Sequence, residues 1–439
     1  RGMGSPLGLW WFAPVLSGGG YGSEAVALLL GLHSARSYPP TLAVRATHHG
    51  DVVDYAHFVG LPSDQREALE ATLRSPVPSA EHAVVVCHSE PGAWFPAMYE
   101  TPRCPPPGTA VAVGRTMFET DRLDPKHVKR CNKMHEVWVP TRWGADVFAA
   151  SGVFPEKIKV VPEAVDVHRF DAEVVASLPR FDLEARATQV LGPPGDRGTE
   201  LGTKFLSVFK WETRKAPEVL LAAYLDEFTA DDDVGLFIRS DLYHEKGDLV
   251  VARIKAFARD AKNRGVARWA RQKNNNKTAG FENAAPPVFV LPRVPEHEMP
   301  SLYHAASAFV LPSRGEGWGR PHCEAMSLGV PVIATNWSGP TAFMTEENSF
   351  PVSIEKDLVA PPQDSHWATH KWAQPKVTHL QQLMREVFEN PEKARAKGKV
   401  AARDVRKAFA PEIVARIVMN HVERIGKEWE GLSIKKTEL

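Results

Sequence analysis

The stretch Ala308-Phe-Val-Leu-Pro-Ser-Arg-Gly-Glu316-Gly-Trp-Gly-Arg-Pro-His-Cys-Glu324-Ala-Met326 decides the expected fold. An apolar run ending at Leu311 predicts a buried strand, and the three glycines after it predict a loop. Pro321 suits the first position of a helix, where its missing N–H would have no partner anyway. Gly329 ends that helix, and residues 331–334 predict the next strand. The order of strand, loop, helix and strand indicates a parallel α/β sheet.

The same alternation continues on both sides of this stretch. It is interrupted at residues 191–202, where prolines, glycines and little periodicity indicate a linker. We therefore expect an α/β chain with two doubly wound parallel-sheet domains, residues 1–195 and 196–411, and a helix at about 412–432 that packs back on the first. Strands are expected at residues 7–15, 41–47, 83–87, 109–114, 135–139, 157–161, 204–209, 234–239, 288–291, 308–311 and 331–334.

Composition narrows the classes of function. The chain has 439 residues, of which 43% are hydrophobic, which is too long for one ordinary core. Its formal net charge is zero, so no overall basic field indicates a nucleic-acid partner. No apolar run reaches the length of a membrane span, and no secretory signal is visible. The compartment stays open between the cytoplasm and a trimmed luminal domain of the secretory pathway, and the oligomeric state stays open too.

The cysteines and acidic clusters predict no metal site. Cys87, Cys104, Cys131 and Cys323 are too widely spaced for a zinc or redox motif. Cys87 ends an apolar run and is expected to be a buried small hydrophobe, and a disulfide is compatible with the sequence but cannot be paired from it. The triplet Asp231-Asp-Asp233 lies between a predicted helix and a predicted strand, and we interpret it as a solvated turn.

The opening stretch also carries chemistry. A helix N-terminus offers N–H groups and a partial positive charge, and glycines let a diphosphate approach the backbone closely. Glu316 lies in the loop and Glu324 lies about one turn into the helix. Two carboxylates at different depths can accept hydrogen bonds from two parts of one extended ligand, such as a sugar and a ribose. The alternative is that Glu324 only complements the helix dipole.

This stretch resembles the Glu-x7-Glu motif of the retaining glycosyltransferases of family 4, also called glycosyl transferases group 1. The resemblance extends over most of the chain and is densest over residues 288–338. It implies the GT-B fold, in which two Rossmann-like domains face each other across a cleft. It also implies transfer of a sugar from a UDP- or GDP-sugar to a hydroxyl of a glycan, glycoprotein or other acceptor, with retention and without a metal or other cofactor.

The resemblance assigns residues to the donor diphosphate. Gly19 and Gly20 match a Gly-rich turn that approaches the diphosphate and faces the acceptor, the alternative being a merely structural turn. Lys210 and Lys215 match two basic residues set against the diphosphate, Lys210 at a position that is usually arginine. Arg214 could substitute for one of them, and the alternative for all three is a surface charge run. Fixed cations there would stabilise a leaving group that gains negative charge.

The remaining donor contacts follow from the same resemblance. Arg293 and Val294 match positions whose backbone meets the nucleotide base. Glu316 and Glu324 are interpreted as binders of sugar and ribose hydroxyls. The loop amides that face the leaving diphosphate belong to Gly317, Trp318, Gly319 and Arg320.

The first domain supplies two further candidates. Many family members carry a histidine near the donor sugar, and this chain has Glu119 at that position. Glu119 is therefore the candidate for orienting the acceptor hydroxyl or binding a donor hydroxyl. His88 is the second candidate, with a structural role as its alternative. Retaining members are described as using the leaving phosphate to assist deprotonation of the acceptor, which would make a dedicated base unnecessary.

Two other classes of function remain compatible with these residues. A nucleotide-sugar epimerase or a glycoside phosphorylase could use the same fold, although an epimerase would act without an acceptor. A non-catalytic nucleotide-sugar-binding protein is the third class, which the presence of both glutamates and both lysines disfavours. The donor sugar, the base and the acceptor are not determined by the sequence.

Overall fold

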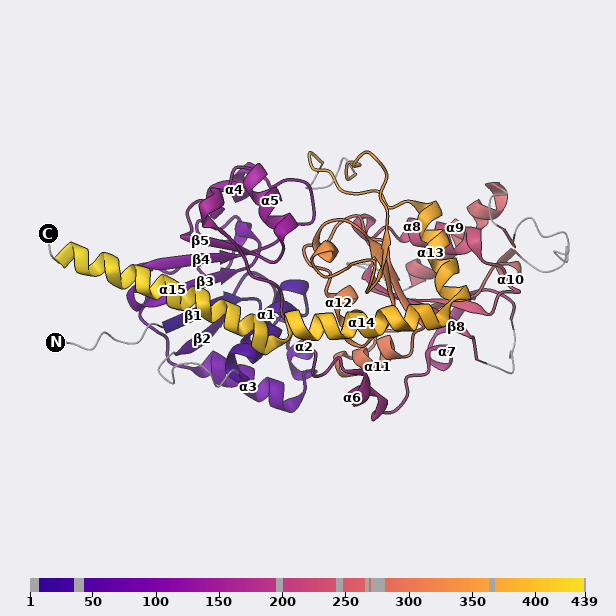
Figure 1. Ribbon diagram of the computed structural model, residues 1–439, viewed down its shortest axis with the longest axis horizontal. Coiled ribbons are helices and arrows are strands. Elements are labelled where there is room, and N and C mark those ends of the chain that lie inside the picture. Colours follow the sequence, from indigo (N-terminus) through magenta and orange to yellow (C-terminus); the bar gives the residue numbers. More distant parts are fainter. Residues whose placement is uncertain are drawn as a thin grey trace. The chain divides into compact units, whose positions relative to one another are not determined.

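The computed structural model describes residues 8–34, 43–194, 200–241, 248–264, 268–269, 281–362 and 368–437. The chain divides into two compact units (Figure 1). The first contains Arg1–Asp166 and Lys407–Leu439, and the second contains Val167–Arg406. Within the described residues, no helix combines the length and the apolar character needed to cross a membrane.

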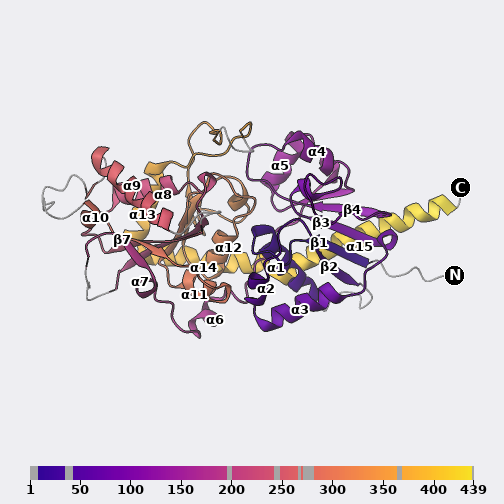
Figure 2. The same cartoon turned by 180° about the vertical axis from the view of Figure 1, so that it is seen from behind.

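The first unit is built on a six-stranded sheet with the order β2-β1-β3-β4-β5-β6, in which every pair is parallel. Figure 2 shows β2, β1, β3 and β4 as neighbouring arrows. The central strand β3 is buried along its whole length, as its run of valines predicts. The strands are β1 (Gly8–Ala13), β2 (Val44–His48), β3 (Ala83–His88), β4 (Val111–Arg115), β5 (Glu136–Val139) and β6 (Ile158–Val160).

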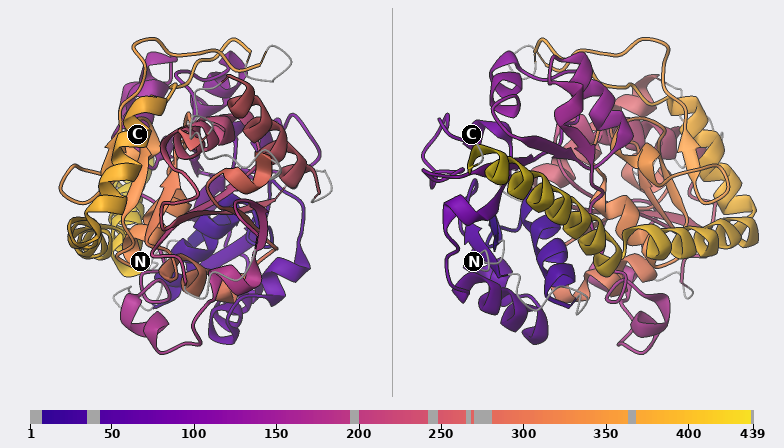
Figure 3. Two further views of the ribbon diagram at one scale, coloured as in Figure 1. Left: turned by 90° about the vertical axis from the view of Figure 1, so that its right-hand side faces the viewer. Right: turned by 60° about the vertical axis from the view of Figure 1, so that its left-hand side comes forward.

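The helices of the first unit come from both ends of the chain. The last helix, α15, packs against α1, and its buried residues Val414 and Val418 belong to the same core cluster as Leu28 of α1. In Figure 3 α15 is drawn in yellow beside the indigo α1. A Cβ at Gly31 would lie 2.4 Å from the Pro411 carbonyl oxygen, so this contact requires glycine. The helices are α1 (Gly20–Ser34), α2 (Tyr55–Val59), α3 (Ser63–Arg74), α4 (Pro125–Cys131), α5 (Arg142–Ala150) and α15 (Pro411–Thr437).

The second unit has a seven-stranded sheet with the order β13-β12-β11-β8-β9-β10-β7. Only β7 is antiparallel to its neighbour among the described strands of this sheet. The strands β8 and β11, which carry the site described below, are adjacent in the middle of the sheet. The strands are β7 (Thr188–Leu191), β8 (Thr203–Lys210), β9 (Val234–Asp241), β10 (Val288–Leu291), β11 (Ala308–Leu311), β12 (Val332–Thr335) and β13 (Phe350–Val352).

Helices follow most strands of the second sheet, as in a doubly wound fold. The helix α14 continues to Phe409, so it leads the chain out of the second unit and into the first. The helices are α6 (Ala172–Ala176), α7 (Leu183–Arg186), α8 (Pro217–Glu227), α9 (Asp248–Arg264), α10 (Phe281–Ala284), α11 (Met299–His304), α12 (Arg320–Ser327), α13 (Val377–Glu389) and α14 (Pro391–Phe409).

The boundary between the units differs from the one expected from the sequence. The expected boundary at residues 195 and 196 lies outside the described residues. The structure divides the chain after Asp166, because β7 hydrogen-bonds to β10 and therefore belongs to the second sheet. A strand of four residues, with two polar residues followed by two apolar ones, carries no periodicity that assigns it to either sheet.

One disulfide joins Cys87 at the end of β3 to Cys104 in the following loop, 17 residues later. The expectation that Cys87 is a small buried hydrophobe therefore needs correction, because its sulfur is bonded. Both sulfur-bearing residues are fully buried, so the bond fixes the loop against the sheet from inside. Among the described cysteines, Cys131 and Cys323 are free and buried.

Replacing Cys87 and Cys104 together with alanine is expected to lower the free energy of unfolding by about 3 kcal/mol, because a cross-link over a loop of this length restricts the unfolded chain. Urea unfolding with and without dithiothreitol measures the change. The double variant should be indifferent to the reductant. Full reduction of the natural chain, verified by thiol titration, with no loss of stability would contradict this expectation.

Candidate functional site

A buried cluster of charges surrounds Glu316 in the second unit. The Lys215 ammonium lies 2.6 Å from Oε1 and 2.8 Å from Oε2 of Glu316. Arg214 adds Nη1 at 2.9 Å from Oε2 and also donates to the Gly315 carbonyl oxygen at 2.7 Å. These residues come from the loops after β8 and β11, and the adjacency of those strands brings the loops together. The side chain of Glu316 is only 8% exposed.

The electrostatics of this cluster keep Glu316 ionised. Burial alone would raise the pKa of Glu316, but Lys215, Arg214 and His322 outweigh burial and hold this pKa at about 2. Burial and the neighbouring Arg214 cation lower the pKa of Lys215 below its ordinary value, while Glu316 opposes that shift. An ammonium has three N–H donors, so Lys215 can serve Glu316 and a second anion together.

Backbone strain is concentrated beside the same cluster. Among the described residues, two non-glycine residues have positive φ angles, Ala216 at 50° and Ser338 at 60°. Ala216 directly follows Lys215 and is the N-cap residue of α8. The Ser338 hydroxyl oxygen accepts the Glu316 N–H at 2.9 Å. Strained backbone that gathers at one place is typical of a functional site.

The helix α12 begins next to Glu316 with no side-chain cap. Its N-cap residue, Gly319, has φ 105°, and a Cβ there would lie 2.9 Å from Nδ1 of His322. Both facts require glycine at this position. The His322 side chain is fully buried, and its Nε2 lies 3.3 Å from the Leu311 carbonyl oxygen. The start of α12 therefore presents backbone rather than side chain to any ligand.

Glu324 lies in the middle of α12, where its surroundings differ from those of Glu316. Its carboxylate receives the Tyr303 hydroxyl at 3.4 Å and lies 3.5 Å from an Arg320 nitrogen. Burial raises the pKa of Glu324, Arg320 opposes the shift, and Glu296 adds to it. The two glutamates of the motif are thus held in different electrostatic states. The contact with Arg320, one turn earlier on the same helix, agrees with the alternative in which Glu324 only stabilises its own helix.

The other residues predicted to contact the nucleotide-sugar donor differ in exposure. Lys210 is exposed at the end of β8, opposite Asp241 in the sheet register. Arg293 is exposed after β10, whereas Val294 is buried at 4% exposure and offers only its backbone. Trp318 is also buried, with its ring 5.1 Å from that of Phe343. Gly317 is buried between Glu316 and Trp318.

In the first unit the Gly-rich turn leads into α1. The Gly19 N–H donates to the Ser17 hydroxyl oxygen at 3.2 Å, and that hydroxyl donates to Asp51 at 2.8 Å. A Cβ at Gly20 would meet nothing within 4 Å, so open space lies beside it. Gly22 is the residue that the turn itself requires, because a Cβ there would lie 2.1 Å from the Ser17 carbonyl oxygen.

His88 lies in a closed network rather than at a surface. Its side chain is fully buried, its Nδ1 accepts from Trp11 Nε1 at 3.1 Å, and its Nε2 lies 2.9 Å from Glu24. Because Trp11 can only donate, the single ring proton must sit on Nε2, which fixes the neutral tautomer. Both ring nitrogens are therefore engaged. These contacts give His88 the surroundings of a positioning residue, and its place near a substrate stays a prediction.

The same network holds Glu24 between two donors. Arg115, at 1% exposure, donates its Nε to Glu24 Oε1 at 2.7 Å, and it also reaches the Val161 carbonyl oxygen. Burial would raise the pKa of Glu24, but Arg115 and the hydrogen bond from His88 hold this pKa at about 2. No sequence motif indicates this buried pair, because its members are 91 residues apart.

Glu119 lies half-buried in the loop after β4. The Tyr21 hydroxyl anchors this loop: it accepts the Met117 N–H at 3.3 Å and lies 3.2 Å from the Thr116 hydroxyl oxygen. Burial raises the pKa of Tyr21 strongly, and the charge of Glu119 contributes to that shift. Glu119 is therefore close to Tyr21, which stands in the first turn of α1 beside Gly20. The structure brings the predicted turn and the predicted carboxylate together within the first unit.

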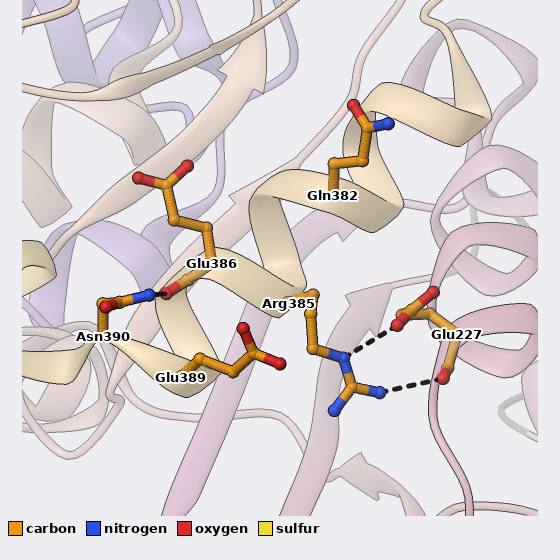
Figure 4. A pocket seen from close by; sticks show the side chains of 6 residues that line it. All are labelled: Glu227, Gln382, Arg385, Glu386, Glu389 and Asn390. Atoms are coloured by element: carbon orange, nitrogen blue, oxygen red, sulfur yellow. Dashed lines mark hydrogen bonds and ion pairs between the residues drawn. The ribbon is translucent and has the colours of Figure 1, made fainter.

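A separate pocket lies at the junction of α8 and α13 in the second unit (Figure 4). Arg385 spans it, with Nε 2.7 Å from Glu227 and Nη1 3.0 Å from Asp232. Asp232, expected in a solvated turn, lies in the turn after α8 and ties that turn to α13. None of the predicted site residues lines this pocket. Its lining consists of Glu227, Gln382, Arg385, Glu386, Glu389 and Asn390.

The part of the chain that matches a known protein family contains most of this site. Residues 254–403, which include Glu316, α12 and Ser338, match the family described as glycosyl transferases group 1. This part of the chain is similar to the glycosyl transferases group 1 family. This confirms the family resemblance on which the motif was interpreted. The group 1 match does not reach Lys210, Arg214 or Lys215, whose loop precedes it in the chain.

One curated protein is similar to a short part of this chain. The O-antigen chain mannosyltransferase B of Escherichia coli is 38% identical over 80 residues, which are 17% of this chain and 21% of that enzyme. The match therefore spans about a fifth of the length of that relative.

Solved structures show the fold. HepE of Anabaena in complex with UDP has a TM-score of 0.58 at 14% identity, over 95% of this chain and all of that one. A glycosyltransferase from Rickettsia africae has a TM-score of 0.59 at 12% identity, over 96% of this chain and 98% of that one. A sucrose-phosphate synthase from Thermosynechococcus elongatus has a TM-score of 0.53 at 14% identity, over 98% and 100% of the two chains. The expected class, two parallel-sheet α/β units of GT-B type, is confirmed.

Proposed function

We propose that this chain is a glycosyltransferase that moves a sugar from a UDP- or GDP-sugar to a hydroxyl acceptor with retention of configuration. The observation that carries the proposal is the buried cluster in which Glu316 receives Lys215 and Arg214 beside the uncapped start of α12. The group 1 family match and the HepE complexes with UDP and UDP-glucose support a nucleotide-sugar donor. The acceptor is proposed to be a glycan or another glycoconjugate.

In the proposed reaction the bond between the sugar C1 and the diphosphate oxygen breaks, and the acceptor oxygen forms a bond to C1 on the same face. The diphosphate leaves with the electron pair and takes the acceptor proton. Lys215, Arg214 and the backbone at the start of α12 stabilise the charge that develops on the leaving oxygen. The proposal assigns the neutralising charge to these side chains and assigns no metal ligands. Lys210 is proposed as an outer contact for the same phosphates.

Binding and positioning are divided among the remaining residues. Glu316, held ionised, is proposed to accept hydrogen bonds from hydroxyls of the donor sugar, and Glu324 from those of the ribose. The backbone at Arg293 and Val294 is proposed to meet the base. Gly19, Gly20 and Glu119 are proposed to face the donor phosphates and the acceptor. His88 is proposed to act indirectly, since its ring packs edge-on against Tyr21 with 5.8 Å between centroids.

A thermal-shift screen against UDP, GDP, ADP and their sugars is expected to reveal one nucleotide that raises the melting temperature. Ligand at a hundred times its dissociation constant stabilises the folded state by about 2.7 kcal/mol. The Glu316→Gln variant should lose most of the extra stabilisation that the sugar adds over the free nucleotide, because it loses the charged acceptor.

Incubation of the stabilising nucleotide sugar with and without candidate acceptors then separates the classes of enzyme. A transferase forms a glycosylated product only when an acceptor hydroxyl is present. An epimerase would convert the nucleotide sugar without an acceptor. Failure of every nucleotide and nucleotide sugar to bind would refute the proposed function.

A further inference from the structure

The loop after β12 lies directly on the backbone of Glu316. The Glu316 N–H donates to the Ser338 hydroxyl oxygen at 2.9 Å, and the Gly339 N–H donates to the Glu316 carbonyl oxygen at 3.0 Å. Ser338 and Gly339 therefore bind both the N–H and the carbonyl oxygen of Glu316. The contact links segments 22 residues apart in sequence, both of them beyond neighbouring parallel strands.

The two backbones touch without room for a side chain between them. A Cβ at Gly339 would lie 2.5 Å from the Trp318 carbonyl oxygen and 2.7 Å from the Trp318 Cα. The Ser338 carbonyl oxygen is also engaged, since it accepts the Thr341 hydroxyl at 2.6 Å. The turn over Glu316 is therefore held from both of its ends, and Glu316 cannot shift without moving Ser338 and Gly339.

Ser338 adopts a backbone conformation that disfavours every side chain. Its φ is 60° and its ψ is −141°, and its side chain is fully buried. Glycine reaches this region without the clash at Cβ, so the shape of the turn alone would be better served by glycine. What serine adds is a hydroxyl oxygen that accepts the buried Glu316 N–H, which would otherwise lose its partner.

We propose that Ser338 is a positioning residue that fixes the backbone of Glu316, so that the carboxylate meets the donor sugar from its place between Lys215 and Arg214. This inference rests on the proposed function for the role of Glu316. The strain at Ser338 is retained because the hydroxyl that comes with it determines the direction of the Glu316 peptide. Lys215 and Arg214 orient the Glu316 carboxylate, whereas Ser338 and Gly339 hold the Glu316 backbone in place.

The variants Ser338→Gly and Ser338→Ala separate strain from positioning. Both remove the hydroxyl, but only the glycine variant also relieves the strain. The glycine variant should therefore melt no lower than the natural chain, and the alanine variant should melt lower. Both should bind a nucleotide sugar about tenfold more weakly, the size of effect of one neutral hydrogen bond, and bind the free nucleoside diphosphate almost unchanged.

The probes for calorimetric titration are UDP-glucose, GDP-mannose, UDP and GDP. Ser327→Ala is the matched control, because it removes another buried hydroxyl of the same unit, which donates to the Phe170 carbonyl oxygen at 2.8 Å. This control should reduce stability without changing the ratio of the two affinities. A purely structural role for Ser338 would weaken nucleotide and nucleotide sugar equally.

Hydrogen exchange at the Glu316 amide gives a readout that needs no ligand. In Ser338→Gly this amide should exchange at least tenfold faster, whereas in Ser327→Ala it should not change. The positioning role is overturned if Ser338→Gly binds the nucleotide sugar as tightly as the natural chain, or if the amide keeps its protection. If the natural chain binds no probe at all, the proposed function fails, and the exchange measurement still decides whether Ser338 holds Glu316.

Discussion

Replacement of Lys215 with alanine is expected to lower kcat/KM of the transferase reaction by about 100- to 1,000-fold, the range seen when one preorganised donor is removed from a developing charge. The variant loses the ammonium that lies 2.6 Å from Glu316 and leaves that carboxylate with Arg214. Most of the loss should appear in kcat, because the leaving diphosphate gains charge as the bond breaks. Steady-state kinetics with the nucleotide sugar found in the screen measures it.

The chain offers a matched control for this variant. Lys204 lies at the amino end of β8, is 9% exposed, and pairs with Glu200 at 3.0 Å and Glu184 at 3.1 Å. Lys204→Ala therefore removes an equally enclosed lysine from the opposite end of the strand that leads to Lys215. It should reduce stability but leave kcat/KM within about twofold, as expected for a residue outside the transition-state contacts. Equal losses in the two variants would remove Lys215 from the reaction.

The second large effect is expected on stability. Glu24→Gln should lower the free energy of unfolding of the natural chain by about 3–5 kcal/mol at pH 7, since it leaves the buried Arg115 without its anion. Arg115 and Glu24 are each 1% exposed, so solvent does not screen the loss. Urea unfolding followed by tryptophan fluorescence suits the measurement, because Trp11 lies in the same network. Glu70→Gln, in the exposed pair with Arg74, should cost only a few tenths of a kcal/mol.

The pH dependence of this effect has a definite sign. The pKa of Glu24 is about 2 in the folded chain, below the ordinary value of about 4.3 in an unfolded one. A lowered folded pKa contributes stability that is fully present above the unfolded pKa and is lost as pH falls towards the folded one. The natural chain should therefore lose about 3 kcal/mol between pH 4.5 and pH 2 through this group. In Glu24→Gln the free energy of unfolding should fall less over this pH range, because the variant has no carboxylate to protonate at this position. The same fall in both proteins would contradict the lowered pKa of Glu24.

The sequence determined the features that are encoded locally. The alternation of apolar and helical runs predicted most strands of both sheets, because strand period and helix period leave different patterns over short windows. The glycines and Pro321 around Glu316 predicted a loop followed by a helix start, which the structure shows at Gly319 and Arg320. The number of residues between Glu316 and Glu324 was enough to place one in the loop and the other on the helix.

Only the tertiary structure decided which of these residues meet. Lys215 and Glu316 are 101 residues apart, and they become partners because β8 and β11 are adjacent in the sheet. Ser338 carried no sequence signal, since its strained φ and its bond to the Glu316 N–H exist only when two loops lie on each other. The tertiary structure likewise decided that Trp11 and Glu24 engage the two ring nitrogens of His88. Local propensity acts over a few residues, whereas ion pairs, buried tautomers and strained turns are set by strand order, which no short window of sequence contains.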